Sequence, residues 1–477
     1  MSSNDSSISK EVAFGFLPAQ KSDRVLGFWS LLLIQLGTGL SCFSLLTGGY
    51  TGIMLDAKDS IGAILFGNAI PMLLIAPIAV YFARYGVDTF VGFRSSLGYL
   101  GSNFLWVLFA VTTLGYTAFT MYMSGQAIVE ILRMFHTDNI FTVNSFGVPF
   151  FSVSLILLCL FITAKGPVVI KYFNWIGAPA MLVLILVLLG VVLFVQGLDK
   201  VFSLQPAEPY ETVRRSFSTA IELNVGLAFS WLPYLGQYSR LGKTEKGAFN
   251  GGFLSYGIGL CIAAVLAVFM TLLTGSLNPT DWMLEIGGTA LAVLGLGLLI
   301  LGNVTAAIFF MYSQAISFKT VFPKQKWAIA MGTNIPVILL VLTPAFYDSY
   351  NIFILFISFI MSVLGGIVVS DFFFVKKQTI SVRDLYNTNG IYKYWHGINP
   401  SAALSMFVGT VFYWYMYNPW LDEPSYLFYY VTAGIPTYFV TGICYYVSSK
   451  FIFITKANKG GQLNIDTNTP GFMKKNL

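Results

Sequence analysis

The sequence predicts an all-α membrane protein whose chain crosses the bilayer twelve times. Of its 477 residues, 56% are hydrophobic and only 10% are charged, and the mean hydropathy is +0.73. A soluble chain cannot bury so much apolar surface and still present a polar exterior. The apolar runs are unbroken over roughly 20 residues, as in helices that cross a membrane, and they do not alternate like the strands of a membrane β-barrel.

Each expected span is a separate hydrophobic window. The windows fall at 26–47, 62–83, 102–130, 149–164, 170–196, 217–238, 252–274, 287–318, 327–346, 351–375, 402–421 and 426–453. No soluble domain interrupts the chain. We therefore expect an N-terminal segment, two groups of five spans, a loop, two further spans and a tail, at residues 1–25, 26–196, 217–375, 376–400, 401–453 and 454–477.

Lysine and arginine predict the orientation of the spans. They gather in the N-terminal segment, in the tail and in the gaps after even-numbered spans, whereas the gaps after odd-numbered spans are mainly acidic and only 197–216 is mixed. Cytoplasmic loops carry an excess of positive charge, and an even number of spans puts both termini on one side. We therefore expect a multi-pass protein of the plasma membrane with both termini in the cytoplasm.

The residue types exclude several function classes. The four cysteines lie in apolar runs without a CxxC pair, and the two histidines are far apart, so no metal-binding cluster is expected. The sequence has no P-loop, no HExxH motif and no nucleophile–base pair. We therefore expect a protein that is not an enzyme, uses no cofactor and binds no nucleic acid, and that is a monomer in the lipid bilayer.

Two spans contain residues that interrupt a helix. The first has the run Gly37 to Gly39 followed by Ser41, and the sixth has Gly226 and the run Ser230 to Pro233. Proline removes a backbone hydrogen bond, and freed backbone groups persist in a membrane only where they face protein or a watery cavity. These are the first spans of two groups of five, and since five is odd the second group would be inverted. The pair predicts a central binding site, although glycines alone would also suit close helix packing.

Polar side chains in two other spans fit such a site. Tyr116 and Thr120 share one face of the third span, where a ring and a hydroxyl would suit a flat heterocycle. Packing in a chain that is 16% aromatic is an equally good explanation. In the eighth span, Asn303 and Thr305 either supply oxygens to a small cation or bond a neighbouring helix.

Acidic residues inside spans have two interpretations. Glu222, about three turns before Pro233, either titrates during transport or is an outer acid paired with Arg214 or Arg215. Asp371 lies at the end of a span, where a solvated position is expected.

Several stretches resemble the nucleobase:cation symporter family, which includes cytosine and hydantoin permeases. The longest are GVDTFVGFRSSLGYLGSNF at Gly86–Phe104 and the segment Ser370–Ala402, which contains SDFFFVKKQTISVRDLY and NGIYKYWHGINPSA. SLLTGG at Ser44–Gly49 and QYSR at Gln237–Arg240 add to them. The resemblance runs in order from about residue 15 to residue 445.

The resemblance implies a leucine-transporter-type fold with inverted repeats of five spans and two extra helices. It also implies alternating access driven by Na⁺ or H⁺. By position, the carbonyls of Gly37 and Leu40 and the hydroxyl of Thr305 would hold the cation. The substrate would be surrounded by Ser41, Tyr116, Thr120, Ala228, Phe229, Ser230, Trp231 and Phe310.

Four residues depart from the family pattern. Gln237 stands where the family usually has Asp, Thr120 replaces a frequent Gln, Val304 replaces Ser or Thr, and Phe310 stands where an amide or acid is common. These changes favour a less polar ring or proton coupling. LGYTA at Leu114–Ala118 and the SWLP run at 230–233 look most similar to permeases for hydroxymethylpyrimidine and other thiamine precursors.

The expected function is therefore import of a small heterocycle by cation symport. The candidate substrates are of the cytosine, purine, hydantoin, allantoin or hydroxymethylpyrimidine type. A facilitative channel or uniporter without cation coupling is the alternative.

Overall fold

Helices make up most of the fold. A computed structural model of the chain describes residues 17–40, 42–135, 139–165 and 167–458. The α-helices are α2 (Phe28–Gly39), α3 (Cys42–Met54), α4 (Ala57–Ile75), α5 (Ile78–Tyr85), α6 (Thr89–Gly92), α7 (Arg94–Leu97), α8 (Tyr99–Phe135), α9 (Asn144–Ala164), α10 (Pro167–Val191), α11 (Leu198–Ser203), α12 (Val213–Phe229), α13 (Leu232–Ser239), α14 (Glu245–Gly252), α15 (Leu260–Thr274), α16 (Pro279–Val321), α17 (Trp327–Gly332), α18 (Val337–Val341), α19 (Pro344–Asp348), α20 (Tyr350–Ser370), α21 (Val382–Leu385), α22 (Pro400–Met416), α23 (Phe428–Val431) and α24 (Gly434–Val447).

Shorter elements connect or extend these helices. The π-helical turns are η3 (Val192–Gln196), η4 (Phe253–Gly259), η5 (Asp371–Val375) and η7 (Ser448–Ile452). The 3₁₀ turns are η1 (Lys21–Asp23), η2 (Ile140–Thr142), η6 (Ile391–Lys393) and η8 (Lys456–Asn458). Strands β1 (Tyr417–Asn418) and β2 (Glu423–Pro424) pair antiparallel as a small hairpin.

The apolar helices occupy the windows that the sequence predicts. Within the described part of the chain, seven helices are long and apolar enough to cross a membrane, and the bent pair α2 and α3 would make eight. The other four windows hold shorter or broken helices: α12 with α13, α17 with α18, α22, and α24. The long third and eighth runs each form one element, α8 and α16, and α16 is kinked at Gly288, where φ is 64°.

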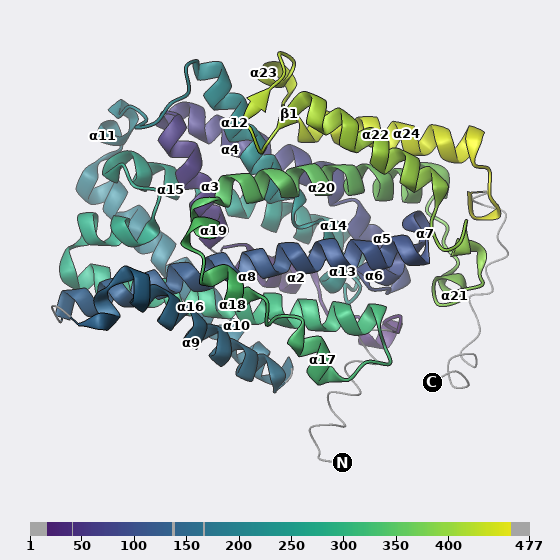
Figure 1. The fold of residues 1–477 in the computed structure, drawn as a ribbon, viewed down its shortest axis with the longest axis horizontal. Helices are drawn as coiled ribbons and strands as arrows, with labels where there is room; N and C mark the ends of the chain where they lie inside the picture. The colour runs from purple at the N-terminus through teal and green to yellow at the C-terminus, as the bar shows by residue number, and fades with distance from the viewer. Residues whose placement is uncertain (1–16, 41, 136–138, 166, 459–477) are drawn as a thin grey trace.

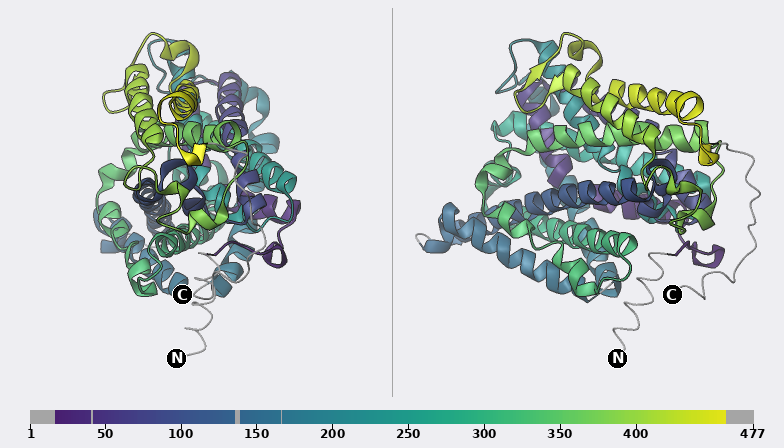
Figure 2. Two further views of the ribbon diagram at one scale, coloured as in Figure 1. Left: turned by 90° about the vertical axis from the view of Figure 1, so that its right-hand side faces the viewer. Right: turned by 45° about the vertical axis from the view of Figure 1, so that its right-hand side comes forward.

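The long helices run side by side along the long axis of the molecule (Figure 1). α8 packs on α16, and α12 packs against α3, α4 and α20, which makes α12 a central element. α22 and α24 lie along one flank, with α24 on α20 (Figure 2). The hairpin and α23 lie toward one end of the bundle, whereas α6, α7 and α21 lie toward the other (Figure 1).

Glycines let some helices touch backbone to backbone. A Cβ at Gly48 of α3 would clash with the carbonyl of Ala264 in α15, and one at Gly52 would lie 2.8 Å from the Cα of Val268. Similarly, a Cβ at Gly226 of α12 would lie 2.5 Å from the carbonyl oxygen of Ile354 in α20. These small residues allow the close approach that membrane helices use for packing.

The two longest stretches that resemble the permease family pack on each other. The N–H of Leu100 donates to the carbonyl of Gly397 at 2.8 Å, and the N–H of Asn399 donates to that of Leu97 at 3.0 Å. Gly98, with a φ of 84°, lies at this contact, where a Cβ would meet Gly397. The contact joins α7 to the segment before α22.

Asp371 forms a buried ion pair with Lys376, which corrects the expectation of a solvated position. Both side chains are 1% exposed. Lys376 also donates to the carbonyl of Ser95 at 2.9 Å, and the Tyr445 hydroxyl donates to Asp371 at 2.7 Å. The acid is therefore enclosed because the loop, α7 and α24 fold over the end of α20.

Candidate functional site

Both predicted helix breaks are present. α2 ends at Gly39 and α3 begins at Cys42, with a bend of 59° between the two. Ser41, a predicted substrate residue, lies outside the described residues. α12 ends at Phe229 and α13 begins at Leu232, with Pro233 in the first turn of α13, where its missing N–H is tolerated. The fold therefore brings two interrupted helices into its centre.

An aromatic cluster lies beside these breaks. Its members are Phe43, Tyr116, Trp231, Tyr234, Tyr256 and Phe310, all at most 3% exposed. The Tyr116 ring stacks on that of Phe310 with centroids 5.6 Å apart and an interplanar angle of 23°. Phe43 meets the edge of Tyr116 at 4.4 Å. The cluster thus joins α3, α8 and α16, which are far apart in sequence.

Trp231 extends the aromatic cluster toward the second half of the chain. Its indole stacks on Tyr256 with centroids 4.2 Å apart and an interplanar angle of 10°. Tyr234 lies 5.5 Å from Trp231 and 5.8 Å from Phe310. Flat rings at these separations would provide stacking surfaces for a flat ligand that entered among them.

Two polar groups in the aromatic cluster lack partners. The Tyr116 hydroxyl and the Trp231 indole N–H are buried and form no hydrogen bond of standard geometry with another described residue, although the Ser230 side chain lies beside the Tyr116 hydroxyl. By contrast, the Tyr234 hydroxyl pairs with Thr113 at 3.1 Å and the Tyr256 hydroxyl with Thr38 at 3.3 Å. Buried polar groups are rarely left unpaired. Tyr116 and Trp231 are therefore available to a ligand with hydrogen-bond acceptors.

Other predicted substrate residues have partners within the protein. The Thr120 hydroxyl donates to the carbonyls of Tyr116 and Thr117 at 3.1 and 2.8 Å. The Ser230 hydroxyl donates to the Leu227 carbonyl at 2.6 Å. Phe229 stacks on Tyr438 of α24 at 5.9 Å, and Ala228 is fully buried in α12. These contacts orient the break in span six around the aromatic cluster.

The predicted cation residues lie on α2 and α16. Gly37 and Leu40 are at the end of α2, where the last carbonyls of a helix lack intrahelical partners. The Thr305 hydroxyl donates to the carbonyl of Leu301 at 2.9 Å, and its side chain lies so close to Gly177 of α10 that a Cβ there would clash. α10 in turn packs on α2. α10 therefore connects the two helices that carry these residues.

Asn303 is a further buried polar residue on α16. It is 0% exposed, and neither atom of its amide makes a hydrogen bond to another described residue. Its two predicted roles therefore stay open.

Glu222 does not occupy the predicted outer position. It is 0% exposed and accepts hydrogen bonds from the hydroxyls of Ser358 and Tyr413 at 2.6 and 2.9 Å. The N–H groups of Ala433 and Gly434 also donate to it, at 2.9 and 3.0 Å. The expected pairing with Arg214 or Arg215 is wrong.

The two arginines bind elsewhere. Arg215 pairs with Asp422 and Glu211, and Arg214 donates to the Tyr430 hydroxyl at 2.9 Å. Arg214 and Arg215 lie in the exposed first turn of α12, and the helix then runs into the interior, where Glu222 lies.

Sequence analysis missed Phe43, Tyr234 and Tyr256. Tyr234 lies three residues after Trp231, so helical spacing would have suggested it. Phe43 lies two residues after Ser41, a spacing that does not place two side chains on one helix face. Tyr256 gives no such signal, because its contact with Trp231 depends on how α13 and η4 pack.

Comparisons with known proteins identify the family to which the sequence is similar. A sequence model of permeases for cytosine/purines, uracil, thiamine and allantoin matches residues 18–440. The hydantoin permease of Microbacterium maritypicum is 25% identical over 405 residues, which cover 80% of each chain. The allantoin permease of Bacillus subtilis strain 168 is 24% identical over 357 residues, covering 69% of this chain and 71% of the relative.

Solved structures show the same fold. An inward-facing structure of Mhp1 matches with a TM-score of 0.77 and 21% identity, covering 92% of this chain and 95% of Mhp1. A closed structure of Mhp1, a nucleobase-cation-symport-1 family transporter with bromovinylhydantoin bound, matches with a TM-score of 0.72 and 21% identity, covering 93% and 97%.

Proposed function

This chain belongs to the family of permeases for cytosine/purines, uracil, thiamine and allantoin, the nucleobase:cation symporters, and on that premise we propose that it imports a flat, neutral nitrogen heterocycle by cation symport. It is a membrane transporter and not an enzyme. The relatives carry hydantoin and allantoin by name, and bromovinylhydantoin is bound in one Mhp1 structure. These names support a substrate of similar size and shape.

The aromatic cluster is the observation that carries this proposal. The Tyr116, Phe310 and Phe43 rings meet at the breaks in spans one and six, and the unpaired Tyr116 hydroxyl and Trp231 N–H lie among them. A heterocycle would separate the rings, stack between them and accept hydrogen bonds from the two donors. None of the six cluster side chains is charged, which favours a neutral substrate because burying an unpaired charge is costly.

The membrane arrangement is part of the same proposal. The chain would cross the membrane twelve times, as two inverted repeats of five spans followed by two extra helices, with both termini in the cytoplasm. The helices found in all twelve windows, the Mhp1 fold and the clustered positive charge support it. The end of the bundle with α7 and α21 would then face the cytoplasm, and the end with the β1–β2 hairpin would face outward.

A cation would bind between the end of α2 and Thr305. Carbonyl and hydroxyl oxygens suit Na⁺, and binding there would favour one position of α2 relative to α16. Alternating access would then couple cation entry to substrate entry. We further propose that the protein acts as a monomer in the plasma membrane.

Uptake into proteoliposomes tests the function. Labelled hydantoin, allantoin, cytosine and hydroxymethylpyrimidine would be offered with an imposed Na⁺ gradient, an imposed proton gradient or neither. Symport predicts that at least one compound accumulates above the outside concentration only with one of the gradients. Equilibration without accumulation would indicate a uniporter, and no uptake of any compound would contradict the proposed substrate class.

A further inference from the structure

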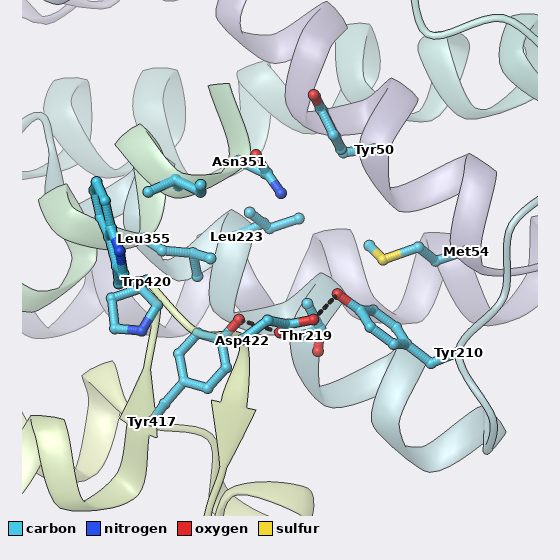
Figure 3. A pocket seen from close by; sticks show the side chains of 12 residues that line it. Tyr50, Met54, Tyr210, Thr219, Leu223, Asn351, Leu355, Tyr417, Trp420 and Asp422 are labelled. Atoms are coloured by element: carbon cyan, nitrogen blue, oxygen red, sulfur yellow. Dashed lines mark hydrogen bonds between the residues drawn. The ribbon is translucent and has the colours of Figure 1, made fainter. Parts of the chain in front are cut away.

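A pocket lies at the β1–β2 hairpin, apart from the aromatic cluster (Figure 3). Its volume is about 110 Å³, several times the roughly 10–15 Å³ that one water requires. α3, α12, α20 and the hairpin all contribute to its wall, including Tyr50, Thr219, Asn351, Tyr417, Trp420 and Asp422. We refer to it as the outer chamber.

The outer chamber is separate from the aromatic cluster. On α12, Thr219 precedes Ala228 by nine residues, or about 13 Å of helix. Tyr350 lies between the two regions: its hydroxyl donates to the Phe43 carbonyl at 3.1 Å, and its ring stacks on Tyr50 with centroids 5.8 Å apart. Of the helices that line the outer chamber, α3 also supplies Phe43 to the aromatic cluster.

Two polar side chains of the outer chamber lack protein partners. The Thr219 side chain is 4% exposed in all, and neither its hydroxyl nor the Asn351 amide bonds another described residue. An amide and a hydroxyl both donate and accept hydrogen bonds. Trp420 lies on one side of Asn351 and Tyr50 on the other (Figure 3). This combination suits a small flat molecule with donors and acceptors on its edge.

Asp422, the charged side chain in the lining of the outer chamber, is bound by its neighbours. Asp422 accepts hydrogen bonds from the hydroxyls of Tyr210 and Tyr417 at 2.9 and 2.7 Å, and Arg215 pairs with it at 3.1 Å. Burial, together with Asp422, raises the pKa of Tyr210, so its hydroxyl stays protonated and continues to donate. The Asp422 carboxylate is therefore satisfied by its neighbours, so it does not require a bound cation to compensate it.

We propose that the outer chamber is a second binding site, which captures the neutral heterocycle before Tyr350 moves aside to admit it to the aromatic cluster. Asn351 and Thr219 would read the polar edge of the ring, and Tyr50 and Trp420 would cover its faces. The identity of the ligand class rests on the proposed function, whereas the location of the site rests on the outer chamber alone.

A cysteine placed in the outer chamber tests the site directly, because a bound ligand should protect its thiol from chemical labelling. Ile352 also lines the outer chamber, so the I352C variant would report its occupancy to a membrane-impermeant maleimide. The C444S background would remove the one native cysteine that is not buried. Adding Y116A would weaken the aromatic cluster, so that remaining protection comes from the outer chamber. L421C, on the exposed hairpin but outside the lining, is the matched control.

The expected result is selective protection. Hydantoin or hydroxymethylpyrimidine should slow labelling of I352C several-fold with and without Y116A, and should leave L421C unaffected. N351L, which removes the amide and fills space, should abolish protection while the melting temperature stays unchanged. In transport by otherwise wild-type protein, N351L should raise KM about tenfold with little change in kcat, because capture precedes the step at the aromatic cluster.

The failures of the two proposals are distinguishable. Uptake that persists while I352C is unprotected in the Y116A background would overturn the outer site and leave the transport function intact. Protection that survives N351L would overturn the assigned role of Asn351 and with it the site as described. Protection without uptake would support the outer site and contradict the proposed transport. Neither protection nor uptake would overturn both.

Discussion

The carboxylate of Glu222 accepts a hydrogen bond from the N–H of Gly434, 3.0 Å away, at the first residue of α24. The first N–H groups of a helix lack intrahelical partners and carry partial positive charge, so an anion is stabilised there. In this fold the anion comes from α12, which carries one of the two breaks. Glu222 therefore fastens the peripheral helix α24 to the central helix.

Replacing Glu222 with Gln should destabilise the protein. The amide offers one acceptor instead of two and brings an NH₂ group toward existing donors, and each buried donor left unpaired costs about 1–3 kcal/mol. The apparent melting temperature of purified protein in detergent should fall by several degrees. The control is E130Q, since Glu130 pairs with the partly exposed Arg133. Equal melting temperatures for the two variants would refute the anchoring role.

Replacing Tyr116 with Ala should weaken heterocycle binding about tenfold or more. It removes a ring on which the ligand would stack, next to Phe43 and Phe310, and an aromatic pair is worth about 0.5–1.5 kcal/mol beyond its buried area. Y116F keeps the ring and should show a smaller loss, due to the hydroxyl. Equilibrium binding of a labelled substrate measures both. Y122A, which removes a ring stacked on Tyr347 away from the aromatic cluster, is the control, and a matching loss there would argue against stacking.

Replacing Thr305 with Ala should reduce cation dependence without abolishing folding. The substitution removes a hydroxyl oxygen next to α10, whereas T305S keeps it. Uptake at varied Na⁺ concentration should show a higher half-saturating concentration for T305A than for T305S. T163A removes a hydroxyl that also bonds its own helix, at 2.7 Å to Cys159, and should leave cation dependence unchanged. If T305A behaves like T163A, the cation lies elsewhere.

Replacing Lys376 with Met should destabilise the protein strongly. It would leave Asp371 as an uncompensated buried charge, and breaking a buried ion pair in this way costs about 3–5 kcal/mol. The double variant D371N/K376M should recover much of the loss, because neither remaining side chain is charged. Thermal unfolding of D371N, K376M and the double variant gives the coupling free energy between the two side chains. Additive losses would show that the two residues do not act as a pair.

Stability should fall as pH rises through the pKa of Asp88. Asp88 is buried at the start of α6, where it accepts from the Phe90 N–H at 3.1 Å, and burial raises its pKa above the usual 3.8, against the opposing effect of Arg240. The folded state then holds the proton more tightly than the unfolded state, so this contribution is present at low pH and lost as the carboxyl ionises. D88N should flatten the dependence of the melting temperature on pH above about pH 4. If the melting temperature of D88N depended on pH as that of the wild type does, groups other than Asp88 would cause the dependence.

The helix breaks were predictable because their causes are local. The Gly37 to Gly39 run and Pro233 disfavour a continuous helix whatever surrounds them, and both breaks are found there. The stack of Tyr116 on Phe310 unites two predicted residues from different spans. Helical spacing suggested Tyr116, whereas the family resemblance supplied Phe310.

The partners of the buried acids could not be predicted because they depend on tertiary packing. Glu222 binds groups on α20, α22 and α24, between 136 and 212 residues away in sequence. Arg214 and Arg215 were nearer in sequence, but α12 turns the acid inward and leaves them at its outer end. Asp371 was expected in solvent because it ends a span, yet the following loop returns over it and supplies Lys376.

The contact of Gly48 and Gly52 with α15 has a mechanical consequence. Because backbone already touches backbone, α3 cannot roll about its own axis on α15 without a collision. We therefore expect the two helices to move together as one rigid unit during transport, bending at the interruption near Leu40. Opening of the outer end would therefore displace α15 as far as α3, and the buried seam between them would remain closed throughout the transport cycle.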